Sequence, residues 1–126
     1  MNAEYYGATQ KSELEVNHLL GITASGREQD WEFEFADFSN IEKMLNILSD
    51  ESLDLETKSA LALLVIASFE EAFKANLDYE IYLSRAARLL SADALVLNRM
   101  KFYWLRLKRA DDVPKVNLLL STNKAI

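Results

Sequence analysis

The sequence predicts a mainly α-helical fold, a single compact bundle of five or six helices. Half of the 126 residues are hydrophobic, and the chain has only three glycines and one proline, which is typical of a helical globular domain. The strongest signal is segment 57–76, where residues 60–67 are eight consecutive apolar side chains. A helix that is apolar on opposite faces is a buried helix. We therefore expect this segment to be the central helix of one domain that spans residues 1–126.

The N-terminal part of the chain has weaker patterns. Residues 1–13 are mostly polar, and we expect this segment, like the tail 121–126, to be loose. Residues 14–22 fit both the two-residue period of a strand and the spacing of a helix. Residues 31–35 alternate three aromatic side chains with two glutamates, which separate onto opposite faces only in an extended chain. We therefore predict that 31–35 is extended and that, if 14–22 is a strand, the two form a short hairpin.

The later helices have recognisable starts. A capping side chain accepts a hydrogen bond from a free N–H group in the first turn of a helix. The expected caps are Ser39, whose capping box is completed by Glu42, then Asp54 for the central helix, Asp78 and Ser91. The helix after Ser91 should cover about residues 93–109, and Pro114 indicates a short last helix over about 114–121.

Composition excludes several classes of protein. The chain has no cysteine, which removes disulfides, thiol nucleophiles and thiolate metal sites. Its first residues lack the basic and apolar regions of a secretory signal. The unbroken apolar run of segment 57–76 is far shorter than the roughly 20 residues of a membrane span. We expect a cytoplasmic protein without a membrane partner.

The charge is segregated along the chain. Residues 1–80 carry 17 acids and 5 bases, a net charge of −12, whereas residues 81–126 carry 3 acids and 9 bases, a net charge of +6. Such segregation can orient a charged partner through the electrostatic field of the protein. The alternative is that the two halves neutralise each other across the folded domain.

The residue types indicate binding rather than catalysis. His18 is the only histidine, and the preferred His and Cys ligands of zinc are almost absent. Carboxylates are abundant and could perform acid–base chemistry or hold a divalent cation, but no calcium-binding loop pattern is present. We therefore expect no enzymatic activity, no catalytic, cofactor-binding or metal-binding residue, no cofactor and no small-molecule substrate.

Acidic residues interleaved with aromatics suit a basic protein partner. Aromatic side chains anchor interfaces, and complementary charge speeds association and adds specificity. We expect most rings of segment 31–38 to pack over the helices and the carboxylates around them to face the partner. The predicted partner-binding residues are Glu28, Asp30, Glu32, Glu34, Asp37, Asp50, Glu51, Asp54 and Glu56, with Glu70, Glu71, Asp78 and Glu80 as a second choice.

A basic segment supports an alternative function. Residues 99–109 contain five cations together with Phe102, Tyr103 and Trp104, a combination also found in nucleic-acid-binding proteins. At 100° per residue, however, these cations do not form one stripe on a helix. The alternative prediction is a small regulatory protein that binds nucleic acid through 99–109. Because the isoelectric point is near 4.8, we favour a protein partner over nucleic acid.

Residues 31–120 resemble a known group of bacterial proteins. The segments WEFEFADFSNIEKMLNIL and LDLETKSALALLVIASFEEAF combine an aromatic and acidic start, a short amphipathic helix and an apolar helix that ends in SFEEA. A Tyr103–Trp104 pair and a final Leu-Leu-Leu turn complete the pattern. In these features the chain resembles the α-helical immunity proteins of contact-dependent growth inhibition systems, which belong to polymorphic-toxin loci.

The resemblance implies a cytoplasmic protein that neutralises a cognate toxin. Its partner would be the C-terminal domain of that toxin, often a nuclease, and inhibition would occur by covering the active or substrate-binding surface. An acidic inhibitor suits this role because it imitates the charge of nucleic acid. No chemistry by the inhibitor itself is implied.

Overall fold

The computed structural model describes residues 4–23, 31–107 and 119–120 of the chain. Within these ranges it contains six α-helices and no strand, which confirms the predicted mainly α-helical bundle. The helices are α1 (Gln10–Leu20), α2 (Trp31–Glu34), α3 (Ile41–Leu48), α4 (Leu55–Lys74), α5 (Glu80–Ala92) and α6 (Ala94–Met100). A short 3-10 turn, η1 (Phe38–Asn40), precedes α3, and a π-helix, η2 (Lys101–Leu107), continues α6.

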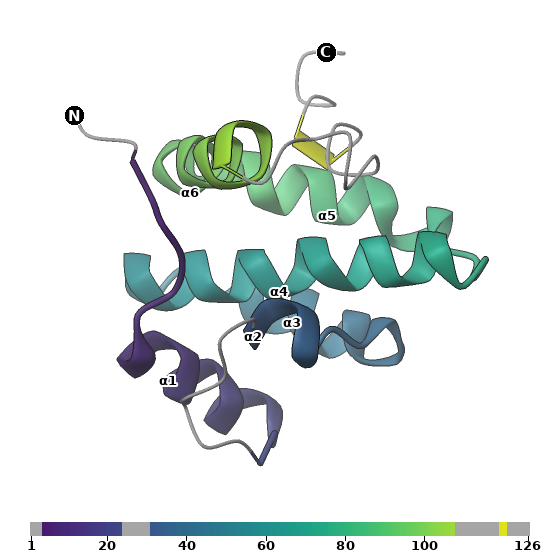
Figure 1. The fold of residues 1–126 in the computed structure, drawn as a ribbon, viewed down its shortest axis with the longest axis horizontal. Helices are drawn as coiled ribbons and strands as arrows, with labels where there is room; N and C mark the ends of the chain where they lie inside the picture. The colour runs from purple at the N-terminus through teal and green to yellow at the C-terminus, as the bar shows by residue number, and fades with distance from the viewer. Residues whose placement is uncertain (1–3, 24–30, 108–118, 121–126) are drawn as a thin grey trace.

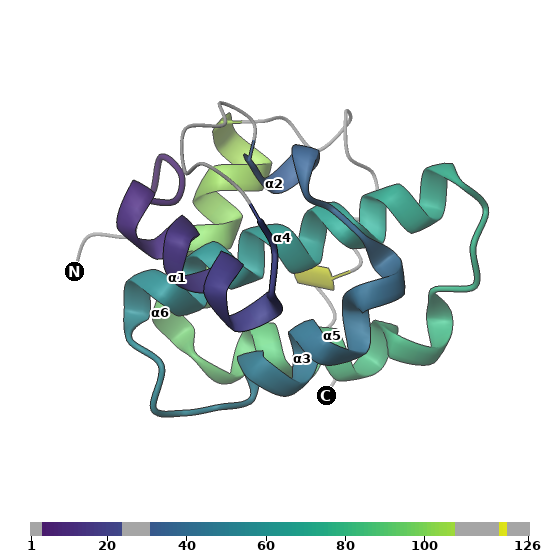
Figure 2. The ribbon, with the colours of Figure 1, turned by 90° about the horizontal axis from the view of Figure 1, so that it is seen from below.

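The helix α4 lies in the middle of the molecule. In Figure 1, α5 and α6 lie above α4, and α1 and α2 lie below it. The helices α1, α2, α3 and α6 all contact α4, and α3 also contacts α5. Figure 2, seen from below, shows α1 and α3 on the near side of α4. None of the helices in the described ranges has the length and apolar character that spanning a membrane requires.

The ends of α4 are fixed by local hydrogen bonds. Asp54 is its N-cap, as predicted, and accepts a hydrogen bond from the backbone N–H of Thr57 at 2.7 Å. This bond holds the pKa of the Asp54 carboxyl below its usual range. At the other end Asn76 has φ 62°, and the N–H of Leu77 donates to the carbonyl of Ala72 at 2.9 Å. This left-handed residue ends the helix and pairs one of its last free carbonyls.

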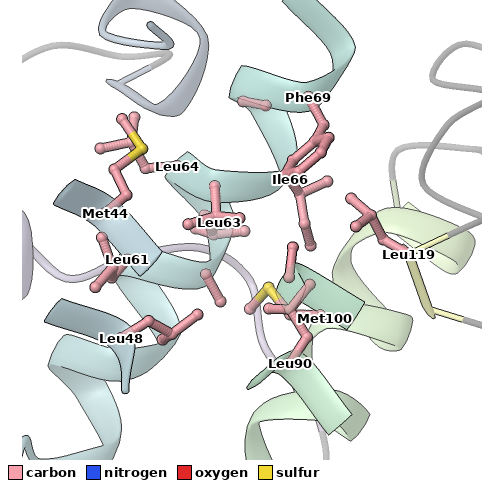
Figure 3. Close-up of a cluster of buried hydrophobic side chains, with 14 of the residues drawn as sticks. Met44, Leu48, Leu61, Leu63, Leu64, Ile66, Phe69, Leu90, Met100 and Leu119 are labelled. Atoms are coloured by element: carbon pink, nitrogen blue, oxygen red, sulfur yellow. The ribbon is translucent and has the colours of Figure 1, made fainter. Parts of the chain in front are cut away.

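The core lies on both sides of α4. Residues 59–70 are all buried. Figure 3 shows that Leu61 and Leu64 face Met44 and Leu48 of α3, while Ile66 lies on the side of Leu90, Met100 and Leu119. Because neighbours cover opposite faces of this helix, its sequence has no polar stripe.

The prediction of an extended segment 31–35 was wrong. Residues 31–34 form a helical turn, and their two aromatic side chains do not share a face: Trp31 is fully buried, whereas Phe33 is 40% exposed. Glu32 is buried and accepts a hydrogen bond from the hydroxyl of Tyr103. The alternation of aromatic and acidic residues therefore does not correspond to two faces of a strand.

The predicted hairpin between residues 14–22 and 31–35 was wrong as well. Residues 14–20 belong to α1, which begins after Thr9 and ends at Gly21. Thr9 caps the helix by accepting a hydrogen bond from the N–H of Ser12 at 3.1 Å, and Gly21 adopts φ 71°. The helical spacing of Val16 and Leu20, both buried, decided between the two patterns that the segment fits.

Three predicted caps were wrong. The side chain that caps η1 is Asp37, and Asn40 at the start of α3 makes no capping bond, so Ser39 does not form a capping box. Tyr79, rather than Asp78, precedes α5. Asp93 caps α6, whereas the Ser91 hydroxyl donates to the carbonyl of Ala87. In each case a neighbour one or two residues away in the chain occupies the cap position.

Part of the N-terminal segment contacts the bundle. Tyr5 is 5% exposed, and residues 10–13 form the first turn of α1. The predicted helix over 93–109 corresponds to α6 and η2 as far as residue 107. Residues 119 and 120 are helical and buried. The rest of the predicted helix over 114–121, and the tail 121–126, lie outside the described residues.

Truncation of Leu64 should show how strongly the fold depends on α4. Leu64 is completely buried, and Leu64→Ala should lower the free energy of unfolding by about 2–5 kcal/mol because it leaves a cavity. The same change at Leu14, which is 42% exposed, should cost about 0.5 kcal/mol or less. Urea unfolding of both variants measures the difference. Equal losses would contradict the placement of α4 at the centre.

Candidate protein-binding groove

A shallow groove lies between α2 and the C-terminal half of α4. Its volume is about 400 Å³. The lining residues are Phe33, Ala36, Ala67, Glu70, Glu71, Lys74 and Ala75. The walls are mostly apolar, with three charged side chains among them. We call this feature the Phe33 groove.

The wall that carries Phe33 is attached to α4 by backbone hydrogen bonds. The N–H of Asp37 donates to the Ser68 hydroxyl at 3.0 Å, and the N–H of Phe38 donates to the Glu71 carboxylate at 2.8 Å. Ser68 in turn donates to the carbonyl of Leu64 at 2.8 Å. The ring of Phe38 packs edge-on against Phe69, with 5.3 Å between the ring centres. These contacts fix the position of the segment 36–38 relative to α4.

Phe33 is supported from behind by the π-helix. Its ring meets Trp104 edge-on, with 5.5 Å between the ring centres and 79° between the planes. Trp104 is completely buried, and it also packs edge-on against Tyr103. Phe33 thus has one edge held by the core while 40% of its surface stays exposed. An aromatic ring that is positioned in advance loses little entropy when a partner covers it.

Carboxylates flank the groove. Glu71 lines it, and Glu34 and Asp37 are exposed next to two lining residues in the chain, Phe33 and Ala36. Asp37 also accepts hydrogen bonds from the N–H and hydroxyl of Ser39, at 3.1 and 2.6 Å. Lys74 is the one basic residue in the lining. A surface that combines a ring face with carboxylates can hold lysine or arginine side chains of a partner.

The structure divides the predicted partner-binding residues into separate groups. Glu34 and Asp37 are exposed and follow lining residues of the groove in the chain, and the second-choice residues Glu70, which is buried, and Glu71, which is exposed, line it. Asp50, Glu51, Asp54 and Glu56 lie at the opposite end of α4, whose 20 residues correspond to about 30 Å. Glu32 is buried and faces inward. Glu28 and Asp30 lie outside the described residues.

The acids of segment 50–56 mostly have structural roles. Asp50 accepts hydrogen bonds from the hydroxyl and the N–H of Ser52, which hold the pKa of its carboxyl below the usual range. Asp54 caps α4. Glu56 pairs with Arg99 at 3.0 Å. All four acids of this group are exposed, and only Glu56 forms an ion pair with a described residue. The predicted surface at 50–56 therefore stays exposed, although three of its four acids also have a partner within the protein.

The remaining second-choice acids lie at the start of α5. Asp78 is exposed in the connection between α4 and α5, and Glu80 is exposed in the first turn of α5. The structure thus places the two second-choice pairs, at 70–71 and at 78–80, on different elements.

The first cation of the basic segment, Arg99, has partners within the protein. Arg99 donates hydrogen bonds to Glu56 and to the Ser59 hydroxyl, and its guanidinium carbon lies 5.1 Å from the centre of the Tyr5 ring. The side chain of Arg99 is 17% exposed. Lys101 is half-buried, and the side chains of Arg106, Lys108 and Arg109 are outside the described part of the chain.

Metal-ligating side chains do not cluster in the described residues. Among these residues no group of three or more His, Asp or Glu side chains could hold a metal ion. His18 is exposed in the last turn of α1.

The sequence did not reveal the small residues that form the groove. Ala36, Ala67 and Ala75 line it, but alanines in an apolar helix fit the core equally well. The exposed ring of Phe33 was also expected to cover the core. No signal in the local pattern separates it from Trp31, because the two rings differ only in their long-range contacts.

Tyr5 allows a test of the anchored N-terminal segment. Burial, reinforced by the Glu56 carboxylate, raises the pKa of its hydroxyl well above the usual range. Within the described residues this hydroxyl has no hydrogen-bond partner. Tyr5→Phe should therefore leave the protein as stable as before, or more stable, at neutral pH.

The pH dependence of stability should differ between this variant and the wild type. Above about pH 10 the unfolded chain releases the Tyr5 proton while the folded chain retains it, so the wild type loses stability as the pH rises. Tyr5→Phe should lose less, and Tyr6→Phe, at a ring that is 69% exposed, should follow the wild type. Urea unfolding between about pH 7 and pH 11 measures both. Parallel curves for all three proteins would contradict the burial of Tyr5.

Comparison with known proteins identifies no relative. No protein-family model, no curated protein sequence and no solved structure matches the chain. The interpretation of the Phe33 groove therefore depends on its own residues.

Proposed function

We propose that the protein is an acidic cytoplasmic binding protein that neutralises a cognate toxin domain, as the α-helical immunity proteins that it resembles do. The observation that carries this proposal is the Phe33 groove, where an exposed, pre-positioned aromatic ring lies beside Glu34, Asp37 and Glu71. The expected partner is a toxin C-terminal domain with a basic surface, and a nuclease domain is the class that fits best. Inhibition would consist of covering the active or substrate-binding surface.

The physical basis is competition for a positive surface. A nuclease binds phosphate groups through lysine and arginine side chains, which create a positive field around its cleft. The net charge of the chain is −6, so a long-range attraction brings the two proteins together. Phe33 then supplies apolar contact at the centre, while the carboxylates pair with cations around it. Such an interface needs no reaction by the inhibitor.

Co-expression tests the proposal as a whole. The partner to use is the C-terminal domain of the large protein encoded directly upstream of this chain. We expect a stoichiometric complex in size-exclusion chromatography at low and at near-physiological salt, and rescue of growth in cells that express the toxin domain. Absence of a complex would overturn the proposal. A shift of duplex DNA or RNA by the chain alone would favour the alternative function, nucleic-acid binding through 99–109.

Two substitutions test the groove within such a complex. Phe33→Ala should weaken binding by roughly 30-fold or more, since it removes a central aromatic contact. Glu34→Arg should slow association and reduce its dependence on salt, because it reverses a charge that is exposed beside the groove. Binding kinetics over a range of salt concentrations measure both effects.

Glu51→Arg is the matched control. It makes the same charge change at an exposed residue at the far end of α4, so it should affect binding much less than Glu34→Arg. If Glu51→Arg weakens binding and the two groove variants do not, the partner binds the acids of segment 50–56, and the assignment of the groove is wrong.

A further inference from the structure

The outer face of α5 is exposed and partly apolar. Ile81 is 75% exposed and Leu77, just before the helix, is 47% exposed, the highest values for large aliphatic side chains among the described residues. Ser84 and Arg88 follow Ile81 at helical spacing and are exposed too. The opposite face of α5 is buried through Ala86 and Leu90. The exposed stripe at 81, 84 and 88, together with Glu80, is called the α5 face below.

Charges on the α5 face are separated along the helix. Glu80 lies in its first turn and Arg88 two turns later, about 12 Å further along the axis. Both side chains are exposed, and neither forms an ion pair with another described residue. Arg85 lies between them in the chain, but its guanidinium donates a hydrogen bond to Asn46 of α3. The face therefore presents one free carboxylate and one free guanidinium, with Ser84 midway between them.

We propose that the α5 face binds the α5 face of a second copy of this chain, with the two helices antiparallel about a two-fold axis at Ser84. A two-fold axis pairs residues whose numbers are symmetric about the centre, so Glu80 of each copy meets Arg88 of the other. By the same rule Ile81 lies opposite position 87 of the other copy, next to the aliphatic stem of Arg88. A parallel arrangement is unfavourable because it places Glu80 against Glu80 and Arg88 against Arg88.

Two further features fit a self-association of this kind. Ser84 has a small side chain, so the helix axes can approach closely at the centre of the contact. Figures 1 and 2 both show α2 and α5 on opposite sides of α4, so the dimer leaves the Phe33 groove accessible. The 13 residues of α5 extend only about 20 Å. A contact of this length buries less than the roughly 800 Å² per partner of a typical stable interface, and the dimer is accordingly weak.

Disulfide trapping tests the position of the axis. The chain has no cysteine, so a single introduced thiol reports only contacts between copies. Ser84→Cys should form a covalent dimer rapidly under mild oxidation, because the two thiols meet at the axis. His18→Cys, at an exposed residue of α1 on the other side of α4, should remain mostly monomeric under the same conditions. Equal rates of cross-linking for the two variants would overturn the proposal.

Charge exchange tests the pairing independently. In sedimentation equilibrium the wild type should associate as its concentration rises toward the millimolar range. Glu80→Arg or Arg88→Glu alone should weaken dimerisation at least roughly tenfold, because each turns two attractive pairs into repulsive ones. The double variant E80R/R88E should restore it, since the exchanged charges again meet opposite charges.

Matched controls account for net charge. Glu15→Arg and Lys11→Glu make the same charge changes on exposed residues of α1 and should leave dimerisation within about twofold of the wild type. A wild type that stays monomeric throughout, or single variants that dimerise as well as the wild type, would overturn the proposal. So would a double variant that is not rescued although circular dichroism shows it folded. None of these outcomes depends on the toxin partner.

Discussion

The burial of α4 on all sides is the constraint on which the rest of the structure depends. Residues 59–70 are buried without a break, so a helix of 20 residues must be covered by neighbours from several directions. Those neighbours are short: α2 has 4 residues and α6 has 7, and helices of this length are not stable alone. They are stabilised by packing on α4, and each places its remaining surface outward. The Phe33 groove is therefore a consequence of how α4 is covered, whereas the α5 face belongs to a helix that packs on α3 and α6.

Local sequence patterns correctly predicted the elements whose signals lie close together in the chain. The apolar run of segment 57–76 and the cap at Asp54 identified α4, because both features lie within a few residues of one another. The prediction that segment 31–35 is extended was wrong for the opposite reason. Trp31 donates to Asn17, 14 residues away, and Glu32 accepts from Tyr103, 71 residues away. Partners so distant in the chain cannot be inferred from alternation, and they outweigh the preference of the local pattern for a strand.

The same limit applies to the binding surface. Charge alone indicated acidic clusters at 28–37 and 50–56; the structure places Glu34 and Asp37 of the first near the C-terminal half of α4 and the second cluster at its N-terminal end. Which acids are available depends on their partners: Glu56 is paired with Arg99 and Glu32 is buried, while Glu34 is exposed beside the groove. The sequence contains each of these residues but not their pairing. The alanines that line the groove cannot be recognised as groove residues from the sequence.

Hydrogen–deuterium exchange of the complex shows whether the protein binds a basic toxin domain through the Phe33 groove. Amide exchange should be measured for the free protein and for its complex with the co-expressed toxin domain. We expect slower exchange in segments 33–38 and 67–75 on binding, with little change in 50–56. Protection of 50–56 with no change around Phe33 would contradict it.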